Sequence, residues 1–174
     1  MIIGLSGKAG AGKSTLGDYL ETRHGFVQFS FAKNLKLAAQ WIFDLSGAQV
    51  FGSGKGDSLE LWSQALGSPQ TPGTLLQAVG SCLRDHLHKD IWILSMLQLV
   101  QRTLAHGASG VITDVRMPNE VKFLRSEGGL LWRIERPGYD GLMGRDPNHI
   151  SEVGLDEYKE WDALIYNTGT IEDL

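Results

Sequence analysis

Residues 7–15 read GKAGAGKST, and no other stretch constrains the fold of this chain as strongly. This stretch follows the short apolar run 2–5 and precedes residues 15–25, where apolar side chains recur at helical spacing. The pattern G-x-x-x-x-G-K-[ST] between a strand and a helix is typical of a loop whose backbone N–H groups converge on phosphate oxygens. A turn that only joins strand to helix does not need the whole pattern, so a phosphate-binding loop (P-loop) is predicted.

The small residues of the P-loop let its main chain come close to a bound triphosphate. The helix that begins near Ser14 adds the positive end of its dipole. Lys13 is expected to place its charge on the β- and γ-phosphates, and the Ser14 hydroxyl to ligate Mg²⁺. Thr15 is an additional residue that kinases often carry. The residues expected to bind ATP are Gly7, Ala9, Gly10, Ala11, Gly12, Lys13, Ser14 and Thr15.

The composition and net charge of the chain limit the classes of partner that it is expected to bind. The chain has 174 residues, 42% apolar and 21% charged, as expected of one soluble domain. A net charge of −4 provides no basic field for a nucleic-acid backbone, so free nucleotides are the expected partners, and a homodimer is left open. The longest apolar run, 91–100, is too short to span a membrane. The single cysteine, Cys82, excludes an internal disulfide, and together with a chain that begins directly in a strand it predicts a cytoplasmic protein, in the host cytoplasm if a phage encodes it.

Strand-like and helix-like runs alternate along the chain, which is typical of an α/β protein with a parallel sheet. Strands are predicted at 2–5, 26–31, 110–114, 129–135 and 163–166. Helices are predicted at 15–25, 32–47, 74–87, 90–107 and 117–129. Residues 47–72 are rich in Gly, Ser and Pro and predict a mobile insertion with one short helix at 59–66. Residues 137–150 predict a lid-like loop.

Asp114 ends the third predicted strand, and Arg116 follows it closely. Ligands of doubly wound sheets lie beyond the carboxyl ends of the strands, so both side chains are expected beside the P-loop. There Asp114 is expected to hold Mg²⁺ directly or through water, together with Ser14, and Arg116 to point into the same space. A helix-capping carboxylate and a surface arginine are the alternatives, which the position at a strand end disfavours.

Four further basic residues are candidates for phosphate contacts. Lys33 and Lys36 lie three positions apart on the first turn of a predicted helix, where solvated surface lysines are the alternative interpretation. Arg136 directly precedes the lid-like loop and Arg145 lies within it; both are candidates to close over phosphates, with an ordinary exposed loop as the alternative. The five histidines show no zinc-ligand spacing, so no structural metal is expected.

Taken together, four blocks of sequence resemble the deoxynucleoside monophosphate kinases of bacteriophages and their bacterial relatives. The blocks are GKAGAGKST at 7–15, LLQAVG at 75–80 with Trp92 downstream, DVRMPNE at 114–120, and RPG at 136–138 followed by HISEVGLD and NTGTIEDL. They span nearly the whole chain. The resemblance implies an adenylate-kinase-like fold: a single domain with a five-stranded parallel sheet, helices on both faces, a P-loop, a monophosphate-binding arm and a small lid.

The resemblance also implies which residues bind the acceptor nucleotide: Leu35, Lys36, Gly80, Ser81, Trp92, Asp114, Arg116 and Glu120. Lys13, Asp114 and Arg116 are the expected catalytic residues. One position departs from the family pattern, because an arginine that commonly clamps the acceptor phosphate is replaced in the stretch that contains Gly73. Arg84, Arg116 or Lys36 are candidates to replace it, and a lower affinity for the acceptor is the alternative.

Three functions are compatible with these residues. The first is transfer of the γ-phosphoryl group of Mg·ATP to a deoxynucleoside monophosphate (dNMP) for DNA precursor synthesis. The second is a kinase with a hydroxyl acceptor, similar to dephospho-coenzyme A kinase, which needs a carboxylate as base; the run 30–36 after the second strand offers no acid, so the phosphate acceptor is favoured. The third, a non-catalytic NTP-binding switch, ranks last because the guanine-reading N-K-x-D is absent.

Overall fold

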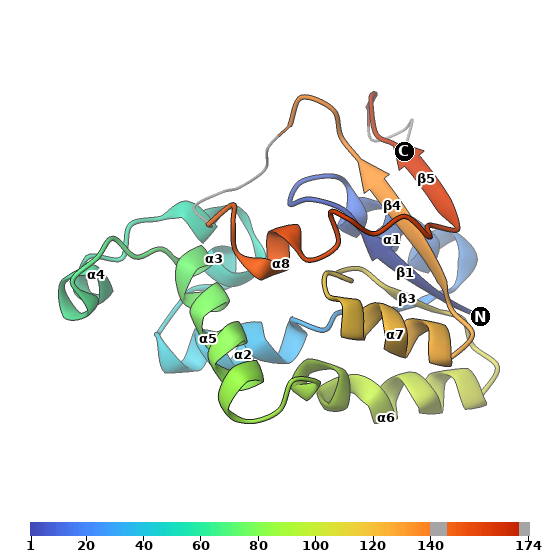
Figure 1. Ribbon diagram of the computed structural model, residues 1–174, viewed down its shortest axis with the longest axis horizontal. Coiled ribbons are helices and arrows are strands. Elements are labelled where there is room, and N and C mark those ends of the chain that lie inside the picture. The colour runs from blue at the N-terminus through green and yellow to red at the C-terminus, as the bar shows by residue number, and fades with distance from the viewer. Residues whose placement is uncertain (140–145, 171–174) are drawn as a thin grey trace.

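The computed structural model describes residues 1–139 and 146–170. Its centre is a sheet of five parallel strands in the order β2-β3-β1-β4-β5 (Figure 1). The strands are β1 (Ile2–Ser6), β2 (Val27–Phe29), β3 (Gly110–Ile112), β4 (Leu130–Glu135) and β5 (Ala163–Tyr166). The predicted doubly wound α/β fold is confirmed, and the wholly apolar run at the N-terminus is the central strand, as expected for a strand covered on both faces.

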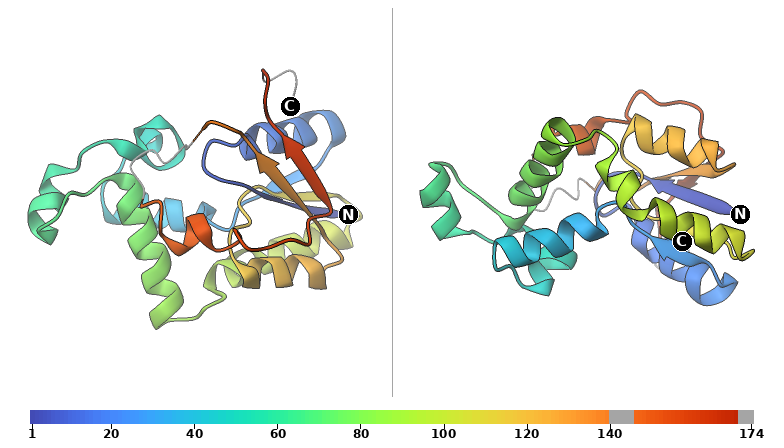
Figure 2. Two further views of the ribbon diagram at one scale, coloured as in Figure 1. Left: turned by 45° about the horizontal axis from the view of Figure 1, so that its top comes forward. Right: turned by 90° about the horizontal axis from the view of Figure 1, so that it is seen from below.

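The two faces of the sheet are buried against different helices (Figures 1 and 2). Ile2 and Ile112 belong to a hydrophobic cluster with residues of α6 (Ile91–Ala105) and α7 (Pro118–Ser126). Ile3 and Val111, one position away on the same strands, pack with residues of α1 (Lys13–His24) instead. This alternation follows from the period of two along a strand.

The parallel register brings the segments that follow the strands to one edge of the sheet. Ile2 pairs with Gly110 and Ile3 with Leu130, so β1, β3 and β4 run side by side and end together. The P-loop follows β1, Asp114 lies just after β3, and Arg136 follows β4. The sequence segments expected to carry the chemistry therefore lie at the carboxyl edge.

The remaining helices project from this edge. They are α2 (Lys33–Ile42), α3 (Gly47–Phe51), the 3₁₀ helix η1 (Ser53–Gly56), α4 (Glu60–Leu66), α5 (Pro72–His86) and α8 (Ile150–Val153). Figure 1 shows α4 at the end of an arm that also contains α3 and part of α5. No helix in the described part of the chain has the length and apolar character that crossing a lipid bilayer requires.

The segment 47–72 is more regular than the sequence predicted. The short helix expected at 59–66 is confirmed as α4, but α3 and η1 were not foreseen. Ser46 and Gln49 cap α3 reciprocally, because each side chain accepts from the backbone N–H of the other residue. Val50 in α3 is fully buried. The glycine-rich composition of this segment did not indicate that it contains a capped helix with one buried apolar side chain.

Candidate active site

The P-loop has a backbone that only glycine adopts readily. Gly7 and Gly12 have φ angles of 146° and 108°, in the left-handed half of conformational space. A Cβ atom at Gly7 would also lie 2.3 Å from the carbonyl oxygen of Ile134 on β4. The loop is therefore pressed against the neighbouring strand, and α1 begins directly behind it at Lys13.

A cavity of about 520 Å³ opens over this loop, and we call it the large cavity. Its volume lies in the range of small-molecule sites. Six of the eight residues predicted to bind ATP line it: Ala9, Gly10, Gly12, Lys13, Ser14 and Thr15. Gly7 and Ala11 do not line it. Asn167, whose side chain donates to the carbonyl oxygen of Ala11 at 3.0 Å, adds the turn after β5 to the wall.

Lys13 is held inside the P-loop. Its Nζ donates to the carbonyl oxygens of Gly7 and Lys8, each at 2.7 Å, and the residue is 8% exposed. Arg136 lines the same cavity from the segment after β4, with its guanidinium 4.6 Å from the centre of the Tyr139 ring. Arg145, the second predicted lid arginine, lies outside the described residues.

Asp114 was predicted to end a strand at 110–114, but β3 ends at Ile112, so Asp114 lies two residues beyond the strand at the carboxyl edge, where its side chain accepts hydrogen bonds. One carboxylate oxygen accepts from the Ser30 hydroxyl at 2.7 Å and from the Ala32 N–H at 2.9 Å, and the other accepts from the Phe31 N–H at 2.8 Å. These bonds fasten the loop after β3 to the loop that leads into α2. They also fix the carboxylate at the border of two cavities.

The second cavity, the small cavity, has a volume of about 100 Å³. One face of α5 lines it with Gly73, Gln77, Gly80 and Arg84, at intervals of four, three and four residues. Lys36, Asp114 and Arg116 line both cavities, so the two meet at these three side chains.

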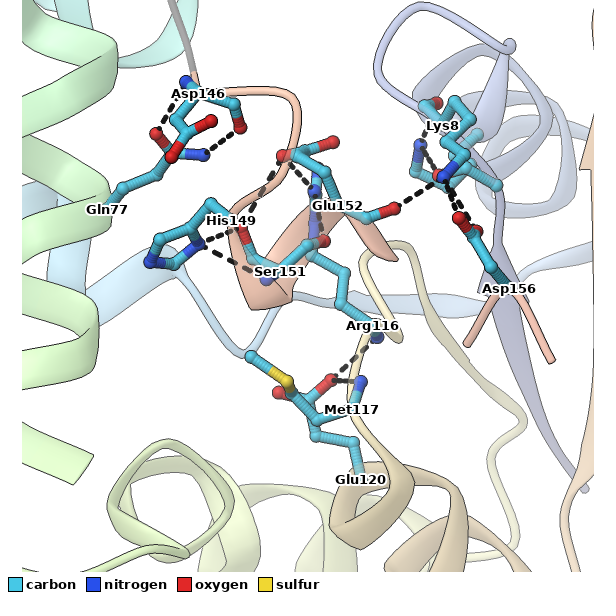
Figure 3. A network of polar contacts seen from close by, with 12 residues as sticks. Lys8, Gln77, Arg116, Met117, Glu120, Asp146, His149, Ser151, Glu152 and Asp156 are labelled. Atoms are coloured by element: carbon cyan, nitrogen blue, oxygen red, sulfur yellow. Dashed lines mark hydrogen bonds and ion pairs between the residues drawn. The ribbon is translucent and has the colours of Figure 1, made fainter. Parts of the chain in front are cut away.

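Arg116 is fixed by contacts on both sides. Its side chain donates to Glu152 Oε1 at 2.6 Å and to the carbonyl oxygen of Ser151 at 2.9 Å. Its backbone N–H donates to Glu120 Oε2 at 2.7 Å (Figure 3). Glu120 is 2% exposed, and burial raises the pKa of its carboxyl to about 7.

The segment 146–156, which contains α8, joins three parts of the site (Figure 3). Lys8 of the P-loop donates to both carboxylate oxygens of Asp156, at 2.6 and 2.7 Å. His149 lies 2.9 Å from the Ser81 hydroxyl of α5, and its Nδ1 accepts the Ser151 N–H. That bond places the ring proton on Nε2, which donates to Ser81. Burial, followed by the charge of Arg84, lowers the pKa of His149, which favours the neutral imidazole.

Comparison with known proteins identifies the chain. The model of the deoxynucleotide monophosphate kinase family matches residues 73–174. A protein of Acanthamoeba polyphaga mimivirus that bears the name of such a kinase is 37% identical over 186 residues, covering 99% of this chain and 91% of that protein. The chain belongs to the deoxynucleotide monophosphate kinase family. It is therefore a phosphotransferase, as predicted.

Two further proteins are similar to this chain. An uncharacterized protein of Ictalurid herpesvirus 1 (strain Auburn) is 29% identical over 173 residues, and the match covers 99% of this chain but only 63% of that longer protein. A sugar kinase from Janibacter sp. HTCC2649 superposes with a TM-score of 0.52 at 13% identity, over 99% of this chain and 88% of the other, which supports the fold alone. Both sequence relatives come from viruses that are not bacteriophages, whereas the four sequence blocks resemble the kinases of bacteriophages.

The residues that the family resemblance implied for the acceptor fall into two groups. Leu35, Lys36 and Gly80 line the small cavity, as do Asp114 and Arg116. The other three, Ser81, Trp92 and Glu120, are not part of its lining.

Each of the three lies one step behind a lining residue. Ser81 contacts His149, and the buried Trp92 donates its ring N–H to the carbonyl oxygen of Gly80 at 3.3 Å. Glu120 holds the backbone at Arg116. Lys33 is exposed and lines neither cavity, so it behaves as the surface lysine of the alternative interpretation.

Sequence reasoning missed several residues of the small cavity. Gln77, His149, Ser151 and Glu152 line it, and none was a predicted site residue. The LLQAVG and HISEVGLD blocks contain all four, so the resemblance pointed to the segments without identifying the side chains.

Proposed function

We propose that this kinase transfers the γ-phosphoryl group of Mg·ATP to the phosphate of a dNMP, giving ADP and a deoxynucleoside diphosphate for DNA precursor synthesis. The observation that carries the proposal is the junction of two cavities at Lys36, Asp114 and Arg116, one over the P-loop and the other against α5. ATP would occupy the large cavity and the acceptor the small one. The phosphates would then meet between two cationic side chains, where charge developing in transfer is stabilised.

The small cavity favours a phosphate acceptor over a hydroxyl. A hydroxyl must lose a proton, so it needs a carboxylate that is free to accept one. Of the two carboxylates that line this cavity, Asp114 accepts three hydrogen bonds and Glu152 accepts the Arg116 side chain at 2.6 Å. Neither is placed to act as that base, whereas a phosphate acceptor is already anionic at neutral pH.

Two oxygens of the large cavity fit Mg²⁺. This ion prefers phosphate oxygens, water and one or two protein oxygens. Ser14 and Asp114 both line the cavity. Asp114 accepts three hydrogen bonds, and a carboxylate has about four acceptor positions, which leaves one for a water molecule on the ion. When bound, Mg²⁺ would neutralise charge on the transferring phosphates.

The cationic residues then have separate tasks. Lys13, held in the P-loop, would contact the β- and γ-phosphates of ATP. Arg136 donates to the carbonyl oxygen of Gly10 at 3.4 Å and would cover the donor phosphates from the side of β4. Arg116, shared by both cavities, would contact the acceptor phosphate during transfer. The net charge of −4 supports free nucleotides as the partners.

Product analysis tests the proposal. The protein is incubated with Mg·ATP and, separately, with each dNMP, each ribonucleoside monophosphate and dephospho-coenzyme A, and the nucleotides are then separated. We expect one deoxynucleoside diphosphate for each ADP formed, and a rate about 10²–10³-fold lower with the Lys13→Ala protein. Phosphorylated dephospho-coenzyme A, or ADP and inorganic phosphate alone, would contradict the proposal.

A further inference from the structure

Arg84 is the cationic side chain of α5 that faces the small cavity. Gly73, Gln77, Gly80 and Arg84 share that face, and the Arg84 side chain is 19% exposed. Its ion-pair partner is Glu120, at 3.7 Å between Arg84 NH2 and Glu120 Oε1. A structural arginine–carboxylate pair is commonly bidentate at about 2.7–2.9 Å. The Arg84 guanidinium is therefore held near Glu120 only loosely, while it still borders the cavity.

Glu120 stands behind the cavity. Its Oε2 accepts the backbone N–H groups of Arg116 at 2.7 Å and Met117 at 3.0 Å, while Oε1 faces Arg84. The buried carboxylate of Glu120 thus holds the backbone at Arg116 and attracts the side chain of Arg84 directly. Because Glu120 lines neither cavity, its carboxylate does not contact a ligand bound there.

We propose that Arg84 and Arg116 together bind the acceptor phosphate, and that Glu120 is the positioning residue that sets both of them. The identity of the ligand as a dNMP rests on the function proposed above, whereas the anion site itself does not. Two guanidinium groups can match the oxygens of one phosphate through several charge-assisted hydrogen bonds. Burial is the main cause that lowers the pKa of Arg84, so a bound anion would offset an existing desolvation cost.

The other candidate for this role, Lys36, is directed elsewhere. Its ammonium lies 5.5 Å from the centre of the Phe51 ring on α3, and the residue borders both cavities. A lysine at this border suits the phosphoryl group in transfer better than the acceptor's own phosphate. This assignment gives the acceptor clamp to Arg84, which lies eleven positions after Gly73 on the same face of α5.

The first test measures binding of a dNMP by calorimetry in the presence of saturating ADP, which occupies the P-loop. For Arg84→Gln and for Arg116→Gln we expect the dNMP to bind about 30-fold more weakly, or about 2 kcal/mol at 1.4 kcal/mol per tenfold. Arg84→Gln should leave the ADP affinity unchanged, because Arg84 does not line the large cavity. Arg102→Gln, the same change on the exposed side of α6, is the control and should bind like wild type. Wild-type dNMP affinity in Arg84→Gln would overturn the assignment.

The second test addresses the positioning role of Glu120. Its carboxyl faces Arg84, which belongs to α5, and it also faces Asp114 and Arg116, which belong to the loop after β3. With a pKa near 7, Glu120 is ionised above pH 7 and attracts Arg84, and it loses that attraction as the pH falls. The wild-type kcat/KM for the acceptor should therefore decrease as the pH falls through about 7.

The Glu120→Gln protein separates this effect from other titrations. Glutamine keeps an oxygen for the two backbone N–H groups but carries no charge, so we expect a kcat/KM near the low-pH plateau of wild type and no step near pH 7. A step near pH 6 remains in both proteins, because the acceptor phosphate itself titrates there. The same step near pH 7 in Glu120→Gln would show that Glu120 is not the titrating group and would overturn its role.

Failure of the two proposals can be told apart. If wild type phosphorylates no dNMP, the proposed function fails, and inorganic phosphate then replaces the dNMP in the calorimetry with saturating ADP. Weaker phosphate binding in Arg84→Gln and Arg116→Gln, but not in Arg102→Gln, would still support the anion site. Equal phosphate binding in all four proteins would overturn it.

Discussion

The two cavities that meet at Asp114 are built in different ways. The large cavity takes six lining residues from the continuous stretch 9–15, and the backbone angles of its glycines fix their positions. The polar side chains of the small cavity come from α2, α5, the loop after β3 and the segment with α8. Contacts such as the reciprocal pair of hydrogen bonds between Gln77 and Asp146, 69 positions apart, hold that cavity together.

This difference decides how each site responds to substitution. A local loop with glycine-specific φ angles either forms or does not, and its charged residue acts directly on the ligand. A cavity assembled from long-range side-chain contacts can lose one contact and keep the rest. We therefore expect large effects on catalysis at the large cavity and graded effects on acceptor affinity at the small one.

The largest effect is expected from Lys13→Ala. The ammonium group is held in the P-loop where it would meet the migrating phosphoryl group, so its loss should lower kcat by about 10²–10³-fold. The fold should survive, because Lys13 is outside both hydrophobic clusters. Steady-state kinetics and thermal melting check the two statements, and a folded variant with the wild-type rate would remove the P-loop from the catalytic site.

The large cavity is built mainly from one continuous stretch and the small cavity from distant segments, and this difference decides how well the sequence predicts each of them. The P-loop pattern, strand periodicity and the position of Asp114 near a strand end are local signals. They predicted the parallel sheet correctly, and they pointed to most of the segments that line the large cavity. Trp92 and Glu120 were implied as ligands by resemblance, yet both lie behind the residues that line the small cavity. Which side of a helix faces a cavity depends on packing with distant segments, and a short motif does not contain that information.

The segment with α8 shows the same limit. The HISEVGLD block was recognised, but only the folded chain brings its His149 to Ser81 and its Asp156 to Lys8. Their sequence separations are 68 and 148 positions. No local pattern marks such pairs.

The second prediction concerns Asp114→Asn, at the border of the two cavities. The carboxylate of Asp114 accepts hydrogen bonds from three donors, and the amide nitrogen of asparagine would face one of them. The loss of that hydrogen bond should lower the free energy of unfolding by about 1–3 kcal/mol. If Asp114 also acts on Mg²⁺ through water, the variant should need more Mg²⁺ for half-maximal activity and have a lower kcat. Thermal melting reports the first effect and a Mg²⁺ titration the second. A lower melting temperature with an unchanged Mg²⁺ requirement would limit Asp114 to its structural contacts.

The third prediction sharpens the assignment of the acceptor clamp. Gly73→Arg adds a cation to a cavity already lined by Arg84, Arg116 and Lys36, near the N-terminus of α5. The small cavity has a volume of only about 100 Å³, so the long side chain should crowd the acceptor and raise its KM by a few-fold, provided that Arg84 already supplies the clamp. Ala78→Arg, on the exposed side of α5, is the control. A lower KM in Gly73→Arg would mean that the clamp is incomplete without an arginine there.

The smallest effect is expected at the contact between the P-loop and the segment with α8. Asp156 pairs with Lys8 of the P-loop, and the segment that contains it also contacts Arg116 through Glu152. The side chains of this pair are 42% and 38% exposed, so Asp156→Asn should cost only about 0.2–1 kcal/mol. The ratio of dNMP affinities with and without ADP measures how strongly the cavities are coupled, and it should move toward one by at most about fivefold. Glu157→Gln removes the same charge at the next exposed position and should leave the ratio unchanged. If both variants keep the wild-type ratio, the Lys8–Asp156 pair joins the two segments in space without coupling their ligands.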